Sequence, residues 1–442
     1  MRRTLALALI GASVLSCAAF LARHPAPIAA PVAAVAPTAP AELPPALAHA
    51  EPVPHEEAPH KDEASPVAGL DLLRISSDDS GLVAPADGGL AHLTIDPDLQ
   101  RTALGLMAAH HPTEAAALLM DVATGRVLVY ASRVDRGPAR DLCVEATAPS
   151  ASVFKIVTAA ALLEDAHLEP DTRQCYSGGE QRIAASDLVD DPQRDRWCAT
   201  LASALGRSIN AVFARLAKEH IAPSQLEAMA RRFGYAQALP FDVPVQPSSL
   251  RVPSEPLELA RTAAGFWNTT LSPLQAVEMS ALVARGGETL RPTIVDKVVS
   301  PAGAVLWTAP DAPQPRRAVA RETTERLSSM MEHTVGEGTS WHAFHDAHGT
   351  PFLPGIGVAG KTGTLTDAET HRYYTWFTGF APVRPQPGEP QVAIAVLVVN
   401  GPVWQVKANV LARDVLRAYF ASRGAKGVSR PSVMAVARHH KR

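Results

Sequence analysis

Three short motifs, each present once and in a fixed order, constrain this chain of 442 residues more than any other feature. They are Ser152-Val-Phe-Lys155, Ser208-Ile-Asn210 and Lys361-Thr-Gly-Thr364. A hydroxyl followed by a lysine three residues later, with two polar elements from distant parts of the chain, is typical of acyl transfer through a serine. The sequence therefore predicts a fold in which all three motifs converge on one cleft.

The first motif lies where a helix is expected to begin. The run from Pro149 to Leu163 favours a helix with Ser152 in its first turn, which places Lys155 on the same face. Free N–H groups and the helix dipole at such a position suit a developing oxyanion. Lys155 can act as a base near neutrality only if burial and a neighbouring cation lower its pKa, and Lys361 could be that cation.

The other two motifs are predicted to reach the same cleft from a helix corner and a strand. Ser208-Ile-Asn210 falls between two helix-like stretches, so its hydroxyl and amide can point into a cleft. Lys361 to Thr364 lies in a strand pattern, where the interior Gly363 indicates close approach of another backbone. An extended peptide could pair with this strand while Lys361 and the threonines hold a carboxylate.

The order of apolar runs predicts an α+β fold, with an antiparallel five-stranded sheet flanked by helices and an adjoining helical lobe. A hairpin is expected over 115–132, around the turn Asp121 to Gly125, and helices are expected from Ser152 to Ile221. The remaining strands and the closing helix are predicted over Gly357–Leu365, Tyr374–Pro382, Gln391–Val399 and Val406–Ser422.

The N-terminus indicates the compartment. Arg2 and Arg3 precede nineteen uncharged residues, Thr4 to Ala22, which is long enough for one membrane span. Val14 to Cys17 also resembles a lipoprotein signal that would lipidate Cys17, and a cleaved signal peptide is a third alternative. In each case the body of the chain is expected outside the cytoplasm.

The chain is expected to divide into four segments. They are an anchor or lipoprotein signal (1–23), a tether and lead-in rich in Pro and Ala (24–88), a catalytic domain (89–422) and a basic tail (423–442). The tether is too poor in large apolar residues to fold on its own, and the tail is expected to be disordered.

Cysteines and charge restrict the possible partners. Cys175 and Cys198 are expected to form a disulfide, the alternative being two unrelated buried thiols. No metal site is expected, because no Cys-x-x-Cys or nearby His pair completes a ligand set with the cysteines. The spacing of His342, His345 and His348 could suggest a metal, but they lie in a polar loop between the motifs. A net charge of −3 gives no reason to expect nucleic acid as a partner.

From about Gly89 to Ser422 the chain resembles the transpeptidase domain of penicillin-binding proteins. Besides the three motifs, the resemblance rests on Thr94 to Gln100, Asp121 to Gly125, Leu271 to Gln275, Val283 to Gly287 and Trp376 to Pro382. One departure is Pro149-Ser-Ala-Ser152, where the family commonly has Pro-Gly-Ser before the nucleophile.

The resemblance implies three catalytic residues. Ser152 would be the acylated nucleophile, Lys155 its general base, and Ser208 the relay that passes a proton to the leaving amine with help from Lys361. The N–H groups of Ser152 and Thr364 would form the oxyanion hole. The substrate-binding residues would be Asn210, Lys361, Thr362, Gly363 and Thr364.

The implied function is a peptidoglycan D,D-transpeptidase that cross-links stem peptides through a serine acyl-enzyme, needs no cofactor and is inhibited by β-lactams. Its partners would be stem peptides, β-lactam antibiotics, the membrane and other cell-wall synthesis proteins. Two alternatives remain at this point. One is a D,D-carboxypeptidase or β-lactamase-like hydrolase, and the other is a non-catalytic β-lactam sensor or cell-wall scaffold.

Overall fold

The computed structural model describes residues 67–434, apart from 267, 311–313 and 368. The expected anchor (1–23), the tether up to residue 66 and the last eight residues of the tail lie outside the described residues. No described helix combines the length and apolarity that a membrane crossing requires.

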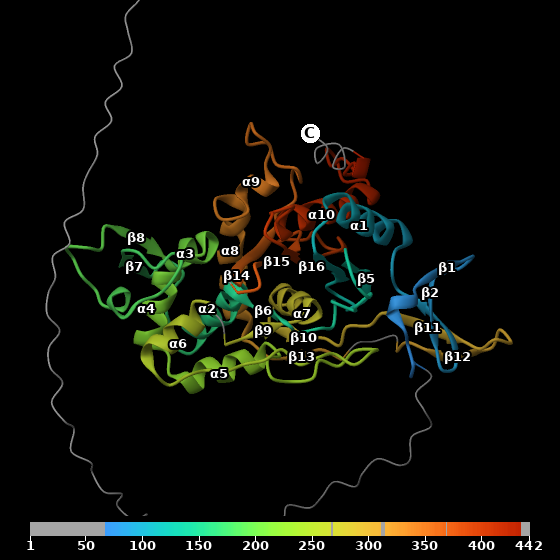
Figure 1. Cartoon of the computed structure of the whole chain (residues 1–442), viewed down its shortest axis with the longest axis horizontal. Coiled ribbons are helices and arrows are strands. Elements are labelled where there is room, and N and C mark those ends of the chain that lie inside the picture. Colours follow the sequence, from blue (N-terminus) through green and yellow to red (C-terminus); the bar gives the residue numbers. More distant parts are fainter. Residues whose placement is uncertain (1–66, 267, 311–313, 368, 435–442) are drawn as a thin grey trace, which may run out of the picture. The chain divides into compact units, whose positions relative to one another are not determined.

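A five-stranded antiparallel sheet stands at the centre of the described chain (Figure 1), as the sequence predicted. Its strands, in spatial order, are β14 (Ala359–Asp367), β15 (Arg372–Ala381), β16 (Val392–Asn400), β4 (Glu114–Asp121) and β5 (Val127–Val134). The predicted strands therefore begin and end within two residues of the observed ones. β14, which carries Lys361 to Thr364, is an edge strand of this sheet.

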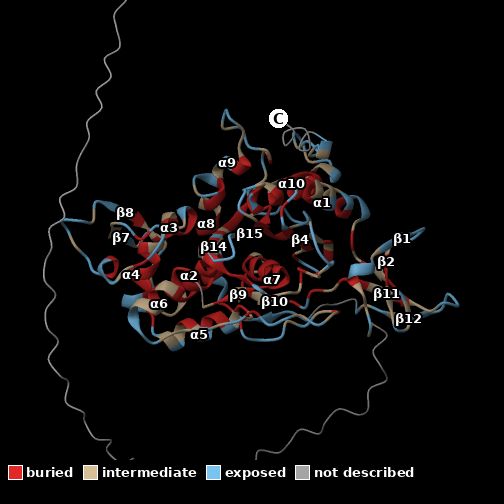
Figure 2. Cartoon of the chain, viewed as in Figure 1, coloured by how far each residue is buried: buried red, intermediate tan, exposed pale blue. Residues whose placement is uncertain are grey.

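Helices cover both faces of the central sheet, which explains why its middle strands are apolar throughout (Figure 2). Side chains of β4 alternate between two cores, so that Leu118 lies in one and Leu119 in the other. The helix α7 (Pro273–Ala284) packs on the first face and is buried almost all round. The helices α1 (Pro97–His110) and α10 (Ala408–Ser422) pack on the second.

A helical lobe lies beside β14. Its helices are α2 (Lys155–Glu164), α3 (Leu201–Arg207), α4 (Asn210–His220), α5 (Pro223–Arg232), α6 (Pro256–Ala263) and α8 (Arg321–Gly336). The prediction of helices from Ser152 to Ile221 was partly wrong, because a hairpin of β7 (Arg173–Tyr176) and β8 (Trp197–Thr200) interrupts them. These strands are only four residues long and mostly exposed or half-buried, so they carry no clear alternation.

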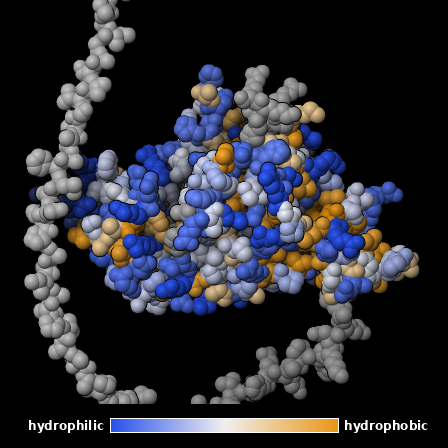
Figure 3. All heavy atoms as spheres, in the orientation of Figure 1, coloured by the Kyte–Doolittle hydropathy of each residue, from blue (hydrophilic) through white to orange (hydrophobic). Residues whose placement is uncertain are grey.

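A second sheet of five strands begins before Gly89, where the folded body was expected to start. Its order is β1 (Ser76–Asp78), β2 (Gly81–Ala86), β3 (Gly89–Leu93), β11 (Val295–Val299) and β12 (Val305–Thr308). Apolar residues reach the surface over this sheet, among them Leu90, Val305 and Leu306 (Figure 3). The lead-in to the domain is thus folded over part of its length, and it depends on strands from the middle of the chain.

The basic tail also differs from its prediction. Up to Met434 it is described, and Val428 and Val433 pack against the core beneath α10. Arg417 on α10 donates to the Ser429 hydroxyl at 2.6 Å. Short elements complete the described chain: η1 (Leu72–Arg74), β6 (Ala148–Pro149), η2 (Ala151–Phe154), η3 (Ala185–Leu188), β9 (Thr270–Leu271), β10 (Glu288–Thr289), β13 (Arg316–Arg317) and α9 (Trp341–Phe344).

Candidate active site

Ser152 lies in the tight 3-10 turn η2, directly before α2, and not in the first turn of the α-helix as predicted. Ala151 takes a left-handed conformation with φ of 48°, which turns the chain sharply before the serine. Gly265 makes this turn possible, since a Cβ at that residue would lie 2.3 Å from the Ala151 carbonyl oxygen. On the other side, Trp376 Nε1 donates to the Pro149 carbonyl at 2.9 Å. The serine is therefore held by well-packed backbone.

Lys155 is fully buried and points at Ser152, with 2.8 Å between its Nζ and the serine Oγ. Its Nζ also lies 2.7 Å from Asn210 Oδ1 and bonds to the Ala264 carbonyl. A neutral amine has two N–H donors and one lone pair. Because two carbonyl oxygens can accept the two N–H bonds, the lone pair is left for the Ser152 hydroxyl, as a general base requires.

Ser208 and Asn210 occupy the corner between α3 and α4, as expected. Ser208 ends α3 in a left-handed conformation with φ of 59°, and Asn210 is the first residue of α4. This sharp corner directs both side chains at the lysines. Lys361 Nζ lies 2.9 Å from Ser208 Oγ, and Lys155 Nζ lies 2.7 Å from Asn210 Oδ1. Ser208 thus connects the second lysine to the cleft.

The strand β14 presents its motif on two faces. Lys361 is fully buried, and its Nζ donates to Ser208 and to the Thr362 carbonyl at 2.8 Å. Gly363 allows the strand to approach η2, since a Cβ there would lie 3.2 Å from that of Ala151. The Thr362 hydroxyl faces the other way and lies 2.6 Å from the Thr339 hydroxyl. The predicted close approach at the glycine is therefore present.

Burial shifts both lysines towards their neutral forms. Burial holds the pKa of Lys155 well below its ordinary value of 10.5, and the positive charge of Lys361 lowers it further. Burial alone lowers the pKa of Lys361 to about 7. The lowered pKa of Lys155 suits this amine to accept a proton, and the pKa of Lys361 lets that residue carry one near neutral pH.

These groups open onto one cleft of about 330 Å³. The predicted residues that line it are Ser152, Ser208, Asn210, Thr362, Gly363 and Thr364. The side-chain nitrogens of the two lysines lie behind this surface. Lys155 contacts Ser152, and Lys361 contacts Ser208. The structure therefore brings all of the predicted site residues together.

A segment closed by a disulfide holds Asn210 in place. Cys175 and Cys198 are paired across β7 and β8 and form a disulfide bond. Within the segment that they enclose, the Glu180 carbonyl accepts from Asn210 Nδ2 at 2.7 Å. This bond fixes the amide so that its Oδ1 faces Lys155. Asn210 is therefore oriented from both ends of its side chain.

Arg215 on α4 is a buried residue that the sequence reasoning missed. Its guanidinium donates to the Asp187 carbonyl at 2.6 Å, to the Cys175 carbonyl at 2.8 Å and to Asp195. It thereby ties the disulfide-closed segment to the helix that begins with Asn210. An arginine within the apolar run from Ala211 to Ala217 was the available signal, because such a charge is buried only when it is paired.

No metal site is apparent at the histidine loop or elsewhere in the described residues, where no three His, Cys, Asp or Glu side chains stand together. His345 instead stacks on Trp341, with 5.0 Å between the ring centres. The thiol of Cys143 is free and buried in the core.

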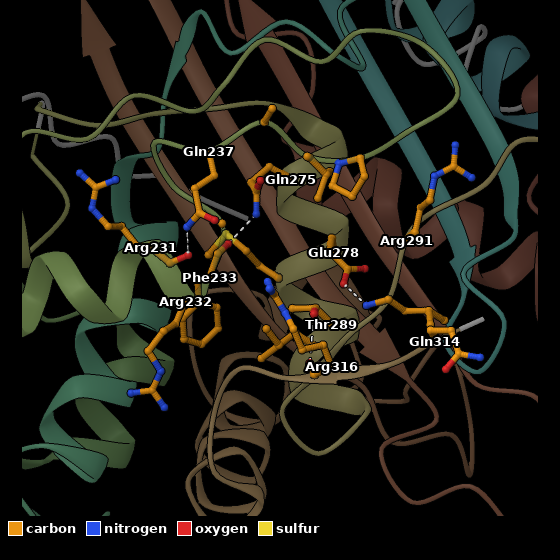
Figure 4. A pocket seen from close by; sticks show the side chains of 17 residues that line it. Arg231, Arg232, Phe233, Gln237, Gln275, Glu278, Thr289, Arg291, Gln314 and Arg316 are labelled. Carbon is orange, nitrogen blue, oxygen red and sulfur yellow. Dashed lines mark hydrogen bonds between the residues drawn. The ribbon is translucent and has the colours of Figure 1, made fainter. Parts of the chain in front are cut away.

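A separate cavity of about 370 Å³ lies between α5 and α7 (Figure 4). Three of its arginines already have carboxylate partners: Arg231 pairs with Glu227, Arg232 with Glu164, and Arg291 with Asp242. None of the predicted site residues lines it. We therefore place the chemistry in the cleft at Ser152.

The two lysines give a testable pH dependence. A general base must be neutral to accept a proton, so with Lys155 as the base the rate of β-lactam acylation is expected to rise with pH through the lowered pKa of that amine. Lys361→Gln removes the neighbouring positive charge, so the pKa of Lys155 should rise and the ascending limb should move to higher pH. The measurement is the pH profile of β-lactam acylation. Lys297→Gln, on β11 of the second sheet, is the matched control. An ascending limb that stays in place in Lys361→Gln would exclude this coupling.

Comparison with known proteins supports the same assignment. Residues 115–417 match the family model of the penicillin binding protein transpeptidase domain. The chain is 28% identical over 356 residues to the peptidoglycan D,D-transpeptidase PbpA of Mycobacterium tuberculosis, covering 71% of this chain and 68% of that protein. It is 26% identical over 339 residues to the stage V sporulation protein D of Bacillus subtilis, covering 72% of this chain and 50% of the relative.

Solved structures show the same fold. The D,D-transpeptidase domain of a peptidoglycan glycosyltransferase from Eggerthella lenta aligns with a TM-score of 0.61 and 25% identity, covering 76% of this chain and 83% of that one. The imipenem acyl-enzyme complex of penicillin-binding protein A from M. tuberculosis aligns with a TM-score of 0.62 and 24% identity, covering 75% and 79%.

Proposed function

This chain belongs to the penicillin-binding protein transpeptidase family, and we propose that it is a peptidoglycan D,D-transpeptidase that works through an acyl-enzyme on Ser152. The observation that carries the proposal is the contact of 2.8 Å between Lys155 Nζ and Ser152 Oγ, at the floor of a cleft that is bordered by an edge strand. The M. tuberculosis relative, which is named a peptidoglycan D,D-transpeptidase, agrees with this chemistry.

The first step is acylation. The donor stem peptide pairs with the free edge of β14, and its terminal carboxylate lies against the hydroxyls of Thr362 and Thr364. Ser152 Oγ attacks the carbonyl carbon of the penultimate D-Ala while its proton passes to Lys155 Nζ. The N–H groups of Ser152 and Thr364 stabilise the oxyanion, a contribution of ~3 kcal/mol for one donor.

The second step expels the terminal D-Ala. Its nitrogen must gain a proton as the C–N bond breaks. Ser208 passes this proton on, because Lys361 Nζ lies 2.9 Å from its hydroxyl and can resupply it. Asn210 holds the amide of the substrate next to the scissile bond. The amine of a neighbouring stem peptide then attacks the ester carbonyl and forms the cross-link as the bond to Ser152 Oγ breaks. Lys155 returns its proton to Ser152 Oγ, and the proton lost by the attacking amine passes through Ser208 to Lys361.

The choice between transfer and hydrolysis is tested by product analysis. The full-length chain is incubated with a donor stem pentapeptide and an amine acceptor, and the products are separated by mass. We expect a cross-linked dimer together with free D-Ala, the two products of transfer. Release of D-Ala without any dimer would assign the chain to D,D-carboxypeptidases. Cleavage of β-lactam with rapid recovery would indicate a β-lactamase.

We also propose that the catalytic domain works outside the cytoplasm, tethered to the membrane by residues 1–23. The basic and apolar residues at the N-terminus support this, as does the disulfide between Cys175 and Cys198, because such bonds persist in oxidising compartments. The mass of the mature N-terminal peptide is the test. An intact Met1 peptide supports a span, and a diacylated Cys17 would replace the span with a lipid anchor.

A further inference from the structure

The start of α10 forms one end of the catalytic cleft. Lys407, which directly precedes the helix, and Asn409 line the cleft together with Ser152 and Thr364. The helix start is fixed beside the threonines, because Thr364 pairs with Thr375 across the sheet and Thr375 Oγ1 accepts the N–H of Ala408 at 3.1 Å. A ligand bound at Thr364 would therefore lie next to the first turn of α10.

The threonine face of β14 needs a cation of its own. Alternate residues of a strand point to opposite faces, and Lys361 points to the Ser208 side, where its ammonium is buried and bonded. In this structure the Lys361 ammonium is therefore directed at Ser208 and away from the hydroxyls of the two threonines. Thr362 and Thr364 face the side of α10, where their hydroxyls are neutral. A carboxylate bound there lacks a charged partner unless another residue supplies one.

Lys407 can supply that charge. Its side chain is exposed, and its Nζ lies 5.6 Å from the centre of the Trp404 ring. Among the residues that the structure describes, no carboxylate pairs with it. It stands at the N-terminal end of a helix of 15 residues, where the helix dipole adds positive potential. The N–H of Asn409 in this first turn likewise has no partner within the described chain.

The Asn409 side chain is a second, independent indication. It is only 7% exposed, and its Nδ2 donates to Ser340 Oγ at 3.2 Å. Its Oδ1 is buried with no hydrogen-bond partner among the described residues, which is costly for an amide. Exchanging the two amide atoms lets Oδ1 accept the Ser340 hydroxyl and frees Nδ2 to donate. Asn409 lines the cleft, and a small shift of its side chain towards a bound anion would satisfy this donor.

We propose that Lys407, the Asn409 amide and the first turn of α10 form an anion subsite that binds the carboxylate of the peptide held at Ser152. The subsite rests on the proposed function, since it assigns a second group of contacts to the same substrate. Thr362 and Thr364 supply neutral hydrogen bonds to the carboxylate, and Lys407 supplies the charge. The subsite thereby selects peptides and β-lactams that carry a free carboxylate.

The test compares a ligand with and without its charge. Second-order acylation constants of the full-length chain are measured with penicillin G and with its methyl ester, in which the carboxylate is masked. Lys407→Gln should lower the constant for penicillin G about 10-fold, as expected for loss of a charge-assisted hydrogen bond, and leave that for the ester within about twofold. Lys407→Arg should restore most of the loss. Lys297→Gln, on β11, should change neither constant.

Asn409→Asp is the second variant. It keeps the size of the side chain but places a negative charge beside the bound carboxylate, so the loss should again be confined to penicillin G. An equal loss with acid and ester in both variants, or no loss in either, would overturn the subsite.

Failure of the chemistry is separable from failure of the subsite. A wild-type chain that neither ligand acylates refutes the proposed function. The subsite is then judged by equilibrium binding of an N-acyl-D-Ala-D-Ala peptide and its C-terminal amide. Weaker binding of the acid alone in Lys407→Gln supports the subsite, and equal binding refutes it.

Discussion

Ser152→Ala is expected to abolish covalent capture of β-lactams, so that fluorescent penicillin no longer labels the chain and the intact mass no longer rises by one adduct. The reason is that Ser152 Oγ is the hydroxyl in contact with Lys155 Nζ, at 2.8 Å. Without that oxygen the acyl bond has no atom to form on, and the cleft retains only non-covalent binding.

Ser150 provides a matched control two residues earlier on the same turn. Its hydroxyl lies 3.1 Å from the Tyr235 hydroxyl and is buried away from the cleft. Ser150→Ala should therefore still be labelled. A labelled Ser152→Ala protein, with the adduct mapped to another residue, would remove Ser152 as the nucleophile.

Lys155→Met should slow β-lactam acylation by about 10²–10⁴, the usual contribution of a positioned base. Methionine fills a similar volume beside the Phe213 ring but cannot accept the proton of Ser152. The measurement is the rate of adduct formation at saturating β-lactam, so that weaker binding is not mistaken for lost chemistry. Near-normal rates would exclude Lys155 as the base.

The pH dependence of thermal stability in the same variant is a second test of Lys155 as the base. The pKa of Lys155 is lower in the folded chain than in the unfolded one, so burying the protonated amine lowers the free energy of unfolding at low pH. This destabilisation disappears as the pH rises towards the ordinary lysine pKa. The substitution Lys155→Met should remove this part of the pH dependence of stability. Near neutral pH, the melting temperature of the variant should be no lower than that of the wild type. A site that loses stability to gain reactivity is consistent with a catalytic role.

The central sheet was predictable from the sequence because its strands are continuous apolar runs separated by clear turns. β16 is buried along its whole length, and the turn from Asp121 to Gly125 marks the hairpin of β4 and β5. The motif side chains were also predictable, since spacing places Ser152 and Lys155 on one face and Gly363 marks a close approach.

The remaining features depend on contacts that local patterns do not carry. β3 pairs with β11 some 200 residues later, which no local pattern indicates. β1 is exposed along its length, so it shows no buried face in the sequence. The carbonyls of Glu180 and Ala264 complete the site through the backbone, which every residue type possesses. The cation that serves the threonine face, Lys407, precedes α10 outside all three motifs.

The pairing of β4 with β16 has a consequence for how this chain reaches its working state. The two strands are about 270 residues apart, yet they are neighbours at the middle of the sheet. Closing so long a loop is slow, and it cannot happen before the last strand has been synthesised. Until then β4 and β5 form a hairpin with an unprotected apolar edge, which favours aggregation. A chain truncated before β16 is therefore expected to yield insoluble protein.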